Sequence, residues 1–124
     1  LSVLDPSVFA SGLNTSTDHI GFEADAVTQA AAGGRLDFVS EKVGARANTA
    51  TVHTAVEDTF VILGFYVDGL NSATPLINGL PGTPLEAGGT NLPIIELAAT
   101  FACLSEGTND PIVSLDWYYC IQVR

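Results

Sequence analysis

The sequence predicts an all-β domain: an antiparallel β-sandwich, jelly-roll-like in its connections, with an extended N-terminal arm and at most one short helix. Alternating or continuously β-branched runs recur along the 124 residues, separated by clusters of Gly, Pro, Asn and Asp, which is the pattern of short strands joined by turns. Only one segment has the pattern of a helix, which excludes the strand–helix alternation of a doubly wound α/β fold. The length is that of one domain.

The N-terminal segment, residues 1–18, is expected to form an extended arm in front of a single sandwich domain that spans residues 19–124. It alternates poorly and is rich in Ser, Thr, Asn and Gly. An extended arm can add a strand to the sheet of a neighbouring subunit, so its apolar residues are candidate subunit contacts. These candidates are Leu1, Val3, Leu4, Val8 and Phe9. Asn14 begins a glycosylation sequon, Asn-Thr-Ser, which chance also produces often.

The next segment, residues 22–34, is the candidate helix. Acidic residues lie in its first turn and two glycines stand at the C-cap position, although a strand that enters a loop is an alternative. Residues 49–56 alternate and predict a strand. Residues 59–67 form an almost continuous β-branched and aromatic run, which predicts a strand covered on both faces.

Residues 70–93 hold four of the six prolines and are expected to form a long loop in which only Pro75–Asn78 pairs briefly. Two further strands are predicted at residues 94–104 and 111–123, each with one apolar face. Trp117 belongs to the apolar face of the last strand, so a core position is preferred over a sugar-stacking surface.

The two cysteines, Cys103 and Cys120, lie on these last two strands and are the candidates for a disulfide in an oxidising compartment. Matching the apolar faces of the strands does not place them opposite each other, so a bridge requires a β-bulge or a non-neighbouring strand. Two separate buried thiols are the alternative. Between them, Glu106 and Asp110 resemble half of a calcium site, and a plain turn is the simpler interpretation.

The charge is strongly acidic, −10 from 14 acidic and four basic residues, and this disfavours nucleic acid as a partner. Three of the basic residues, Arg35, Lys42 and Arg46, are close in the sequence and are candidate contacts for an acidic patch on a neighbouring subunit. No apolar run reaches the length of a membrane span. His19 and His53 share no metal-ligand spacing, and no catalytic motif is present, so no enzymatic activity and no cofactor except calcium are predicted.

Charged residues are only 15% of the chain, which predicts a surface that is largely buried against other subunits. The leading hypothesis is a non-enzymatic structural subunit of an extracellular homopolymer, and the alternative is a secreted, lectin-like carbohydrate-binding module. The chain has no methionine, not even at position 1, so either the numbering starts at an artificial boundary or a leader is removed before Leu1. Removal of a leader would suit a secreted, surface or virion protein. In general composition it resembles phage decoration proteins and microbial surface-fibre subunits, without a motif that identifies a family.

Overall fold

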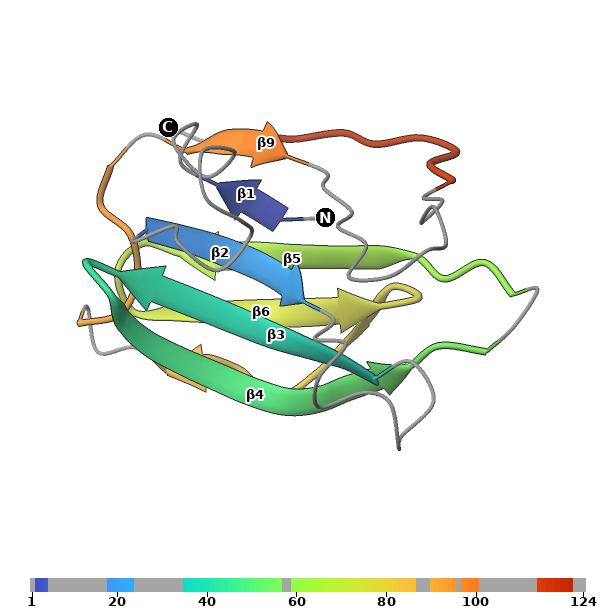
Figure 1. The fold of residues 1–124 in the computed structure, drawn as a ribbon, viewed down its shortest axis with the longest axis horizontal. Helices are drawn as coiled ribbons and strands as arrows, with labels where there is room; N and C mark the ends of the chain where they lie inside the picture. The colour runs from blue at the N-terminus through green and yellow to red at the C-terminus, as the bar shows by residue number, and fades with distance from the viewer. Residues whose placement is uncertain are drawn as a thin grey trace, which may run out of the picture.

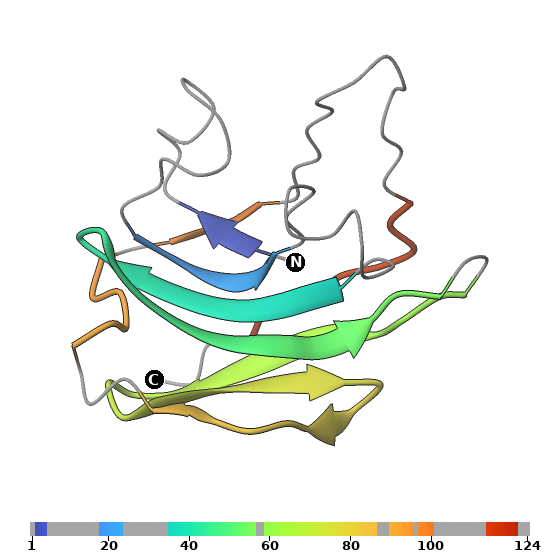
Figure 2. The same ribbon diagram turned by 60° about the horizontal axis from the view of Figure 1, so that its bottom comes forward.

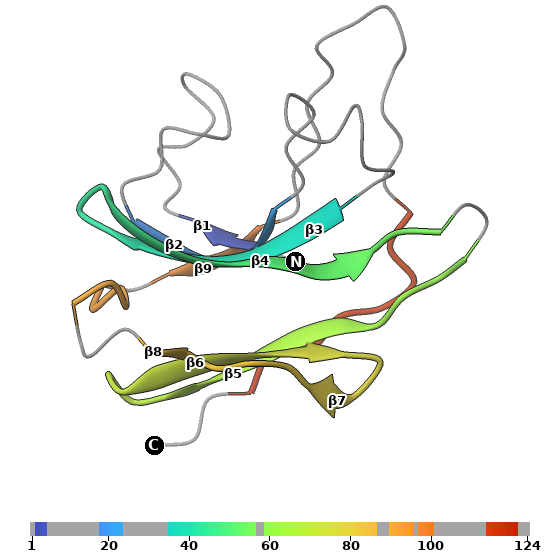
Figure 3. The ribbon, with the colours of Figure 1, turned by 90° about the horizontal axis from the view of Figure 1, so that it is seen from below.

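The protein is all-β, with two antiparallel sheets (Figure 1). The computed structural model describes residues 2–4, 18–23, 35–56, 59–86, 90–95, 97–100 and 114–121. Nine strands and no helix lie among these residues. The two sheets form two layers, as Figure 2 and Figure 3 show, and the predicted class is confirmed at this level.

The first sheet has five strands in the order β4-β3-β2-β1-β9. Their bounds are Ser2–Leu4 (β1), Asp18–Glu23 (β2), Arg35–Lys42 (β3), Ala45–Thr54 (β4) and Ala98–Thr100 (β9). The first four strands follow one another as an antiparallel meander, and this order does not by itself establish jelly-roll connections. β1 pairs with β2 on one side and with β9 on the other, so the start of the predicted arm belongs to the chain's own sheet.

The second sheet has four strands, in the order β5-β6-β7 with β8 also paired to β6. Their bounds are Leu63–Asp68 (β5), Ser72–Ile77 (β6), Leu80–Pro81 (β7) and Leu85–Glu86 (β8). Three of these strands lie inside residues 70–93, so the prediction of a long loop there was wrong. The prediction gave more weight to the prolines than to Asn78-Gly79, a turn signal with apolar residues on both sides.

Pro75 explains why β6 has two short partners on one side. The N–H of Gly82 donates to the Pro75 carbonyl at 2.8 Å, so this carbonyl faces β7 and β8. The Pro75 nitrogen faces the same way but has no hydrogen to donate. A continuous partner strand would place one of its own carbonyls opposite the Pro75 nitrogen, where that carbonyl would find no donor. The pairing divides instead into β7 and β8.

The core lies between the sheets. Phe22 and Phe38 are directly opposite each other in the first sheet, and Phe65 approaches both from the second. Their ring centroids are 5.1 to 6.5 Å apart at tilted angles, which is a favourable aromatic arrangement. The buried residues around them come from both layers and from the segment between β8 and β9, and they are Ile20, Ala73, Leu85 and Leu92.

Two tight turns use residues in the left-handed region of backbone space. Asn78 and Gly79 join β6 to β7 with φ of 52° and 80°, as a two-residue type I′ turn requires. Val43 and Gly44 join β3 to β4 with φ of 50° and 76°. Asn-Gly is the preferred pair for such a turn, whereas a β-branched valine at positive φ is strained.

Other predicted elements are confirmed only in part. The strand predicted at residues 49–56 overlaps β4, and the run 59–67 overlaps β5. Tyr66 and Val67 are exposed, so the prediction that this strand is covered on both faces was wrong. Phe22 and Glu23 end a strand, so the helix predicted to begin at residue 22 does not begin there, and residues 24–34 lie outside the described part of the chain. Within residues 94–104 the described strand is β9 alone.

The segment 114–121, which we call the C-terminal segment, lies where a strand was predicted but belongs to neither sheet and is exposed along its whole length. In Figure 3 it runs from the level of the first sheet to that of the second. Trp117 is 56% exposed, so the prediction of a core tryptophan was wrong. The alternation of its side chains was identified correctly, but no described strand covers the apolar face.

Candidate functional site

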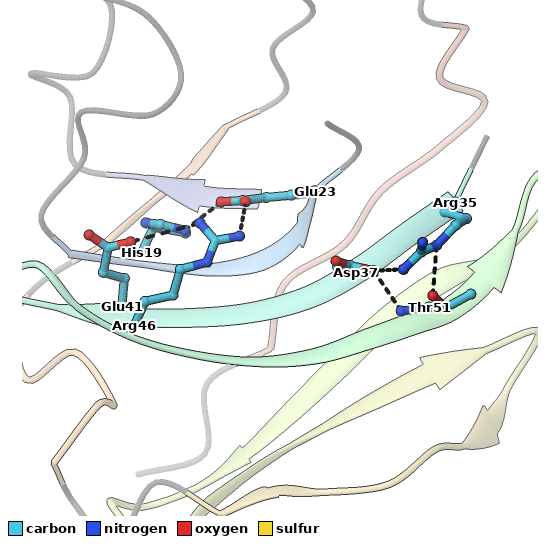
Figure 4. Close-up of polar contacts among 7 residues, drawn as sticks. All are labelled: His19, Glu23, Arg35, Asp37, Glu41, Arg46 and Thr51. Carbon is cyan, nitrogen blue, oxygen red and sulfur yellow. Dashed lines mark hydrogen bonds and ion pairs between the residues drawn. The ribbon is translucent and has the colours of Figure 1, made fainter. Parts of the chain in front are cut away.

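Four charged or polar side chains gather on the outer face of the first sheet, the face away from the core (Figure 4). His19 and Glu23 come from β2, Glu41 from β3 and Arg46 from β4. His19 Nε2 lies 2.6 Å from Glu23 Oε1, and Arg46 lies 2.6 Å from Glu23 Oε2 and 3.9 Å from Glu41 Oε2. We call these four residues the outer-face cluster.

The spacing of His19 and Glu23 explains how two side chains four residues apart on a strand meet. Residues 19, 21 and 23 share one face of β2 because side chains alternate along a strand. Position 21 is a glycine, so no side chain separates the imidazole from the carboxylate. The same face includes the buried Val39 of β3, whose backbone pairs with Gly21.

Glu23 is the electrostatic centre of the cluster. Burial by itself raises the pKa of this carboxyl, but the hydrogen bonds from His19 and Arg46 and the positive charge of Arg46 outweigh it. The pKa of Glu23 is therefore lower than its ordinary value of 4.5. The carboxylate is ionised at neutral pH and holds β2 to β4 across the intervening β3.

His19 is 2% exposed, which is unusual for this residue type. Its Nε2 lies 2.6 Å from Glu23 Oε1, whereas Nδ1 has no hydrogen-bond partner among the described residues. The sequence analysis assigned His19 no contact, and the pattern His-x-Gly-x-Glu was the signal that could have placed His19 and Glu23 on one face of a strand.

A second polar group stabilises the bulge between β3 and β4 (Figure 4). Residues 50–52 of β4 occupy the space that β3 fills with Asp37 alone, and Thr51 takes a φ of 54°. The Thr51 N–H donates to Asp37 Oδ1 at 2.5 Å, and Arg35 Nε donates to Thr51 Oγ1 at 2.8 Å. These contacts offset the strain of a β-branched residue at positive φ.

The three basic residues predicted as a subunit contact lie on neighbouring strands, at the start of β3 (Arg35), its end (Lys42) and in β4 (Arg46). Arg46 contacts Glu23 and Glu41, and Arg35 lies 4.0 Å from Asp37. Lys42 stands opposite Asp18 in the strand register. Both arginines thus contact carboxylates of their own sheet, and their contact with another subunit stays a prediction.

Several predicted site residues lie outside the described part of the chain, and they are Leu1, Val8, Phe9, Asn14, Cys103, Glu106 and Asp110. For Val3 and Leu4 the structure describes the backbone, in β1. Cys120 is an exposed free thiol, so the structure does not support the predicted bridge to Cys103. Among the described residues, no three His, Cys, Asp or Glu side chains are grouped as a metal site. His53 is half-buried in β4, opposite Leu36.

The C-terminal segment is the most unusual surface of the described structure. Its exposed large side chains are Leu115 (49%), Trp117 (56%), Tyr118 (60%), Tyr119 (67%) and Ile121 (75%). Trp117 and Tyr119 stack with their ring planes 8° from parallel and their centroids 5.5 Å apart. Such a run of exposed aromatic and aliphatic side chains is rare on a monomer and typical of a surface that binds another molecule.

No family model, curated protein or solved structure matches the chain. In the part of the chain that the structure describes, no helix has the length and apolarity needed to cross a bilayer. Among the described residues, the two candidate functional surfaces are the outer-face cluster and the C-terminal segment.

Proposed function

We propose that this protein is a non-enzymatic structural subunit of an extracellular homopolymeric assembly, either a virion capsid or decoration protein or a surface filament. In this proposal the partners are copies of the same chain or other subunits of the assembly. The sandwich, with jelly-roll-like connections, is the rigid body of the subunit. The outer-face cluster joins three strands of that body, because Arg46 of β4 contacts Glu23 of β2 and Glu41 of β3.

The exposed C-terminal segment carries the proposal. A solitary subunit would keep five large apolar or aromatic side chains of this segment in water, at a cost of roughly 25 cal/mol for each Å² of apolar area. A low share of charged residues, 15% of the chain, supports the same conclusion, because surfaces buried between subunits are depleted in charge.

The structure changes which residues we assign to the contact between subunits. The N-terminal arm was the expected contact, but residues 2–4 pair within their own sheet. The arginines of the basic group contact carboxylates of their own chain. We therefore assign the main contact to the C-terminal segment, with the residues near Arg35, Lys42 and Arg46 in a secondary role.

The mass of the particles in solution tests this function. We expect sedimentation to show species larger than one subunit, with a mean mass that rises with concentration. Replacing Trp117 and Tyr119 together by serine should return the mass to that of one subunit, because both exposed rings are removed. Val43→Ser is the matched control, since Val43 is exposed but lies in the distant β3–β4 turn. A wild-type protein that stays a monomer at high concentration would contradict the proposal.

The exposed aromatic rings also favour a second candidate, the lectin-like module. Sugars bind by stacking on aromatic faces, and calcium would come from Glu106 and Asp110 in this interpretation. Trp117 and Tyr119 each cover part of the other's face, which leaves less ring area for a sugar. Saturable quenching of Trp117 fluorescence by oligosaccharides, abolished by a chelator, would favour this function over the first.

A further inference from the structure

The two sheets carry different side chains on their outer faces. The outer face of the first sheet holds the charged outer-face cluster. In the second sheet, Leu63 and Phe65 pack against the core, so the alternate positions face outward, on the side turned away from the first sheet (Figure 3). In β5 and β6 these outward positions are Gly64, Tyr66, Asp68, Ser72, Thr74 and Leu76.

This outer face of the second sheet is apolar where the solvated side of a sheet is normally polar. Phe60, Ile62 and Tyr66 stand at even positions of the chain and are 82%, 54% and 52% exposed. Gly64, between Ile62 and Tyr66, has no side chain. Asp68 is the one charged residue among the outward positions of β5 and β6, and it lies at the end of the row away from Phe60. In the described part of the chain no third sheet covers this face.

We propose that the outer face of the second sheet is a contact between two copies of this chain, which pack face to face across a two-fold axis. The inference rests on the proposed function, because the C-terminal segment is what first brings the copies together. The new contact is made by residues outside that segment, so the two contacts can be tested separately.

The row of residues is complementary to itself when the strands of the two copies run in opposite directions. With the axis between Ile62 and Gly64, each Ile62 lies over the Gly64 of the other copy, where no side chain opposes it. Each Phe60 then lies beside the other copy's Tyr66. The two Asp68 carboxylates stay outside the contact, at its opposite ends, so no charge is buried without a partner. This self-complementarity favours a second copy as the occupant.

The exposed area sets the strength of the contact. Aromatic side chains bury roughly 150–250 Å² each, so Phe60 and Tyr66, at 82% and 52% exposure, offer about 270 Å². With Ile62, two copies bury about 700 Å² in all, less than a stable dimer of free subunits needs. The contact therefore forms between copies that the C-terminal segments already hold, because their effective concentration is high.

Cross-linking at position 64 tests the proposal. The protein carries Cys103→Ser, Cys120→Ser and Gly64→Cys, so the new thiol is the only one. A Cβ at position 64 would lie 3.8 Å from Leu76, which is ordinary contact, so the strand accepts the change. A short bis-maleimide is added at a concentration where sedimentation shows this protein to be polymeric. We expect covalent dimers to form about tenfold faster than with Asp68→Cys in place of Gly64→Cys.

Asp68→Cys is the matched control because position 68 is exposed on the same strand and the same face. In the proposed contact the two copies of this position are about 33 Å apart along the strands, beyond the reach of the reagent. Equal rates in a polymeric protein would overturn the face-to-face contact and leave the proposed function standing. A wild-type protein that stays monomeric removes both.

A charge placed within the row provides a second measurement. We expect Tyr66→Asp to lower the mean particle mass by about half, because a carboxylate there opposes the contact and the copies then join through the C-terminal segment alone. Val43→Asp is the control, since Val43 is 79% exposed but belongs to the β3–β4 turn of the first sheet. Equal masses for the two variants would overturn the proposal.

Discussion

Pro75 and Gly82 meet at the point where the partner of β6 changes from β7 to β8. The Gly82 N–H donates to the Pro75 carbonyl at 2.8 Å, and a Cβ at position 82 would lie 3.2 Å from Pro75 Cγ. A proline ring cannot bend away as a flexible side chain does, so the close approach of these two residues requires glycine.

Gly82→Ala should therefore destabilise the fold, by about 1 kcal/mol, the low end of the cost of overpacking. Gly64→Ala is the control: its Cβ would lie 3.8 Å from Leu76, which is ordinary contact, and the loss of unfolded-state freedom should stabilise by roughly 0.5 kcal/mol. Urea unfolding measures both values. Equal stabilities for the two variants would contradict the role of this contact.

Val43→Asn should stabilise the protein. Val43 is 79% exposed, so its removal loses little packing, and a β-branched residue at positive φ costs roughly 1–2 kcal/mol that asparagine largely avoids. We expect a gain of about 1 kcal/mol in unfolding free energy, and thermal unfolding several degrees higher.

The reverse change in the second turn is the counterpart. Asn78→Val introduces the same strain and removes the acceptor of the Ile62 N–H, which lies 2.9 Å from Asn78 Oδ1. Stability should fall by about 1–2 kcal/mol, since a backbone donor is left without its partner. The two turn variants must shift the urea midpoint in opposite directions, and a shift in the same direction would refute the argument.

Glu23 should make stability depend on pH in the acidic range. Its pKa is depressed in the folded protein, so its contribution is fully present above the ordinary value of 4.5 and is lost as the pH falls through the lower, folded value. Glu23→Gln removes this ionisation. We expect the urea midpoints of wild type and variant, measured from about pH 6 to about pH 3, to differ most at the upper end and to converge on acidification.

Trp117 is the only tryptophan, so its fluorescence reports on the C-terminal segment alone. In dilute solution, where single copies dominate, we expect red-shifted emission and ready quenching by iodide, as for an exposed indole. With increasing concentration the emission should shift to the blue and the quenching should weaken, because a partner covers the ring. A spectrum that does not change while the mass rises would place the contact elsewhere.

The sequence predicted the all-β class and the strand near residues 49–56, because alternation is a local property of the chain. It missed β6 and β7, although Asn78-Gly79 between Leu76-Ile77 and Leu80 is a strong hairpin signal that the neighbouring prolines obscured. It also placed Trp117 in the core. Alternation shows which side chains share a face, but not whether another strand covers that face.

The outer-face cluster could not be predicted from the sequence, for a different reason. Glu23 and Arg46 belong to β2 and β4, and they meet across β3 only because of the strand register. Glu23 was interpreted as the first turn of a helix, which is a natural reading of an acidic residue before a run of alanines. Long-range pairing is set by the whole fold, and neither partner identifies the other in the sequence.

The position of β1 has a consequence for synthesis on the ribosome. Ser2 pairs with Thr100 on one side and with Gly21 on the other, so β1 has to wait for a partner that is made much later. The nascent chain can form the β2–β4 meander early, but one edge of β1 stays unpaired until β9 emerges. Closing so long a loop is slow, and we expect chaperones to bind a growing chain whose strand edge is unpaired in this way.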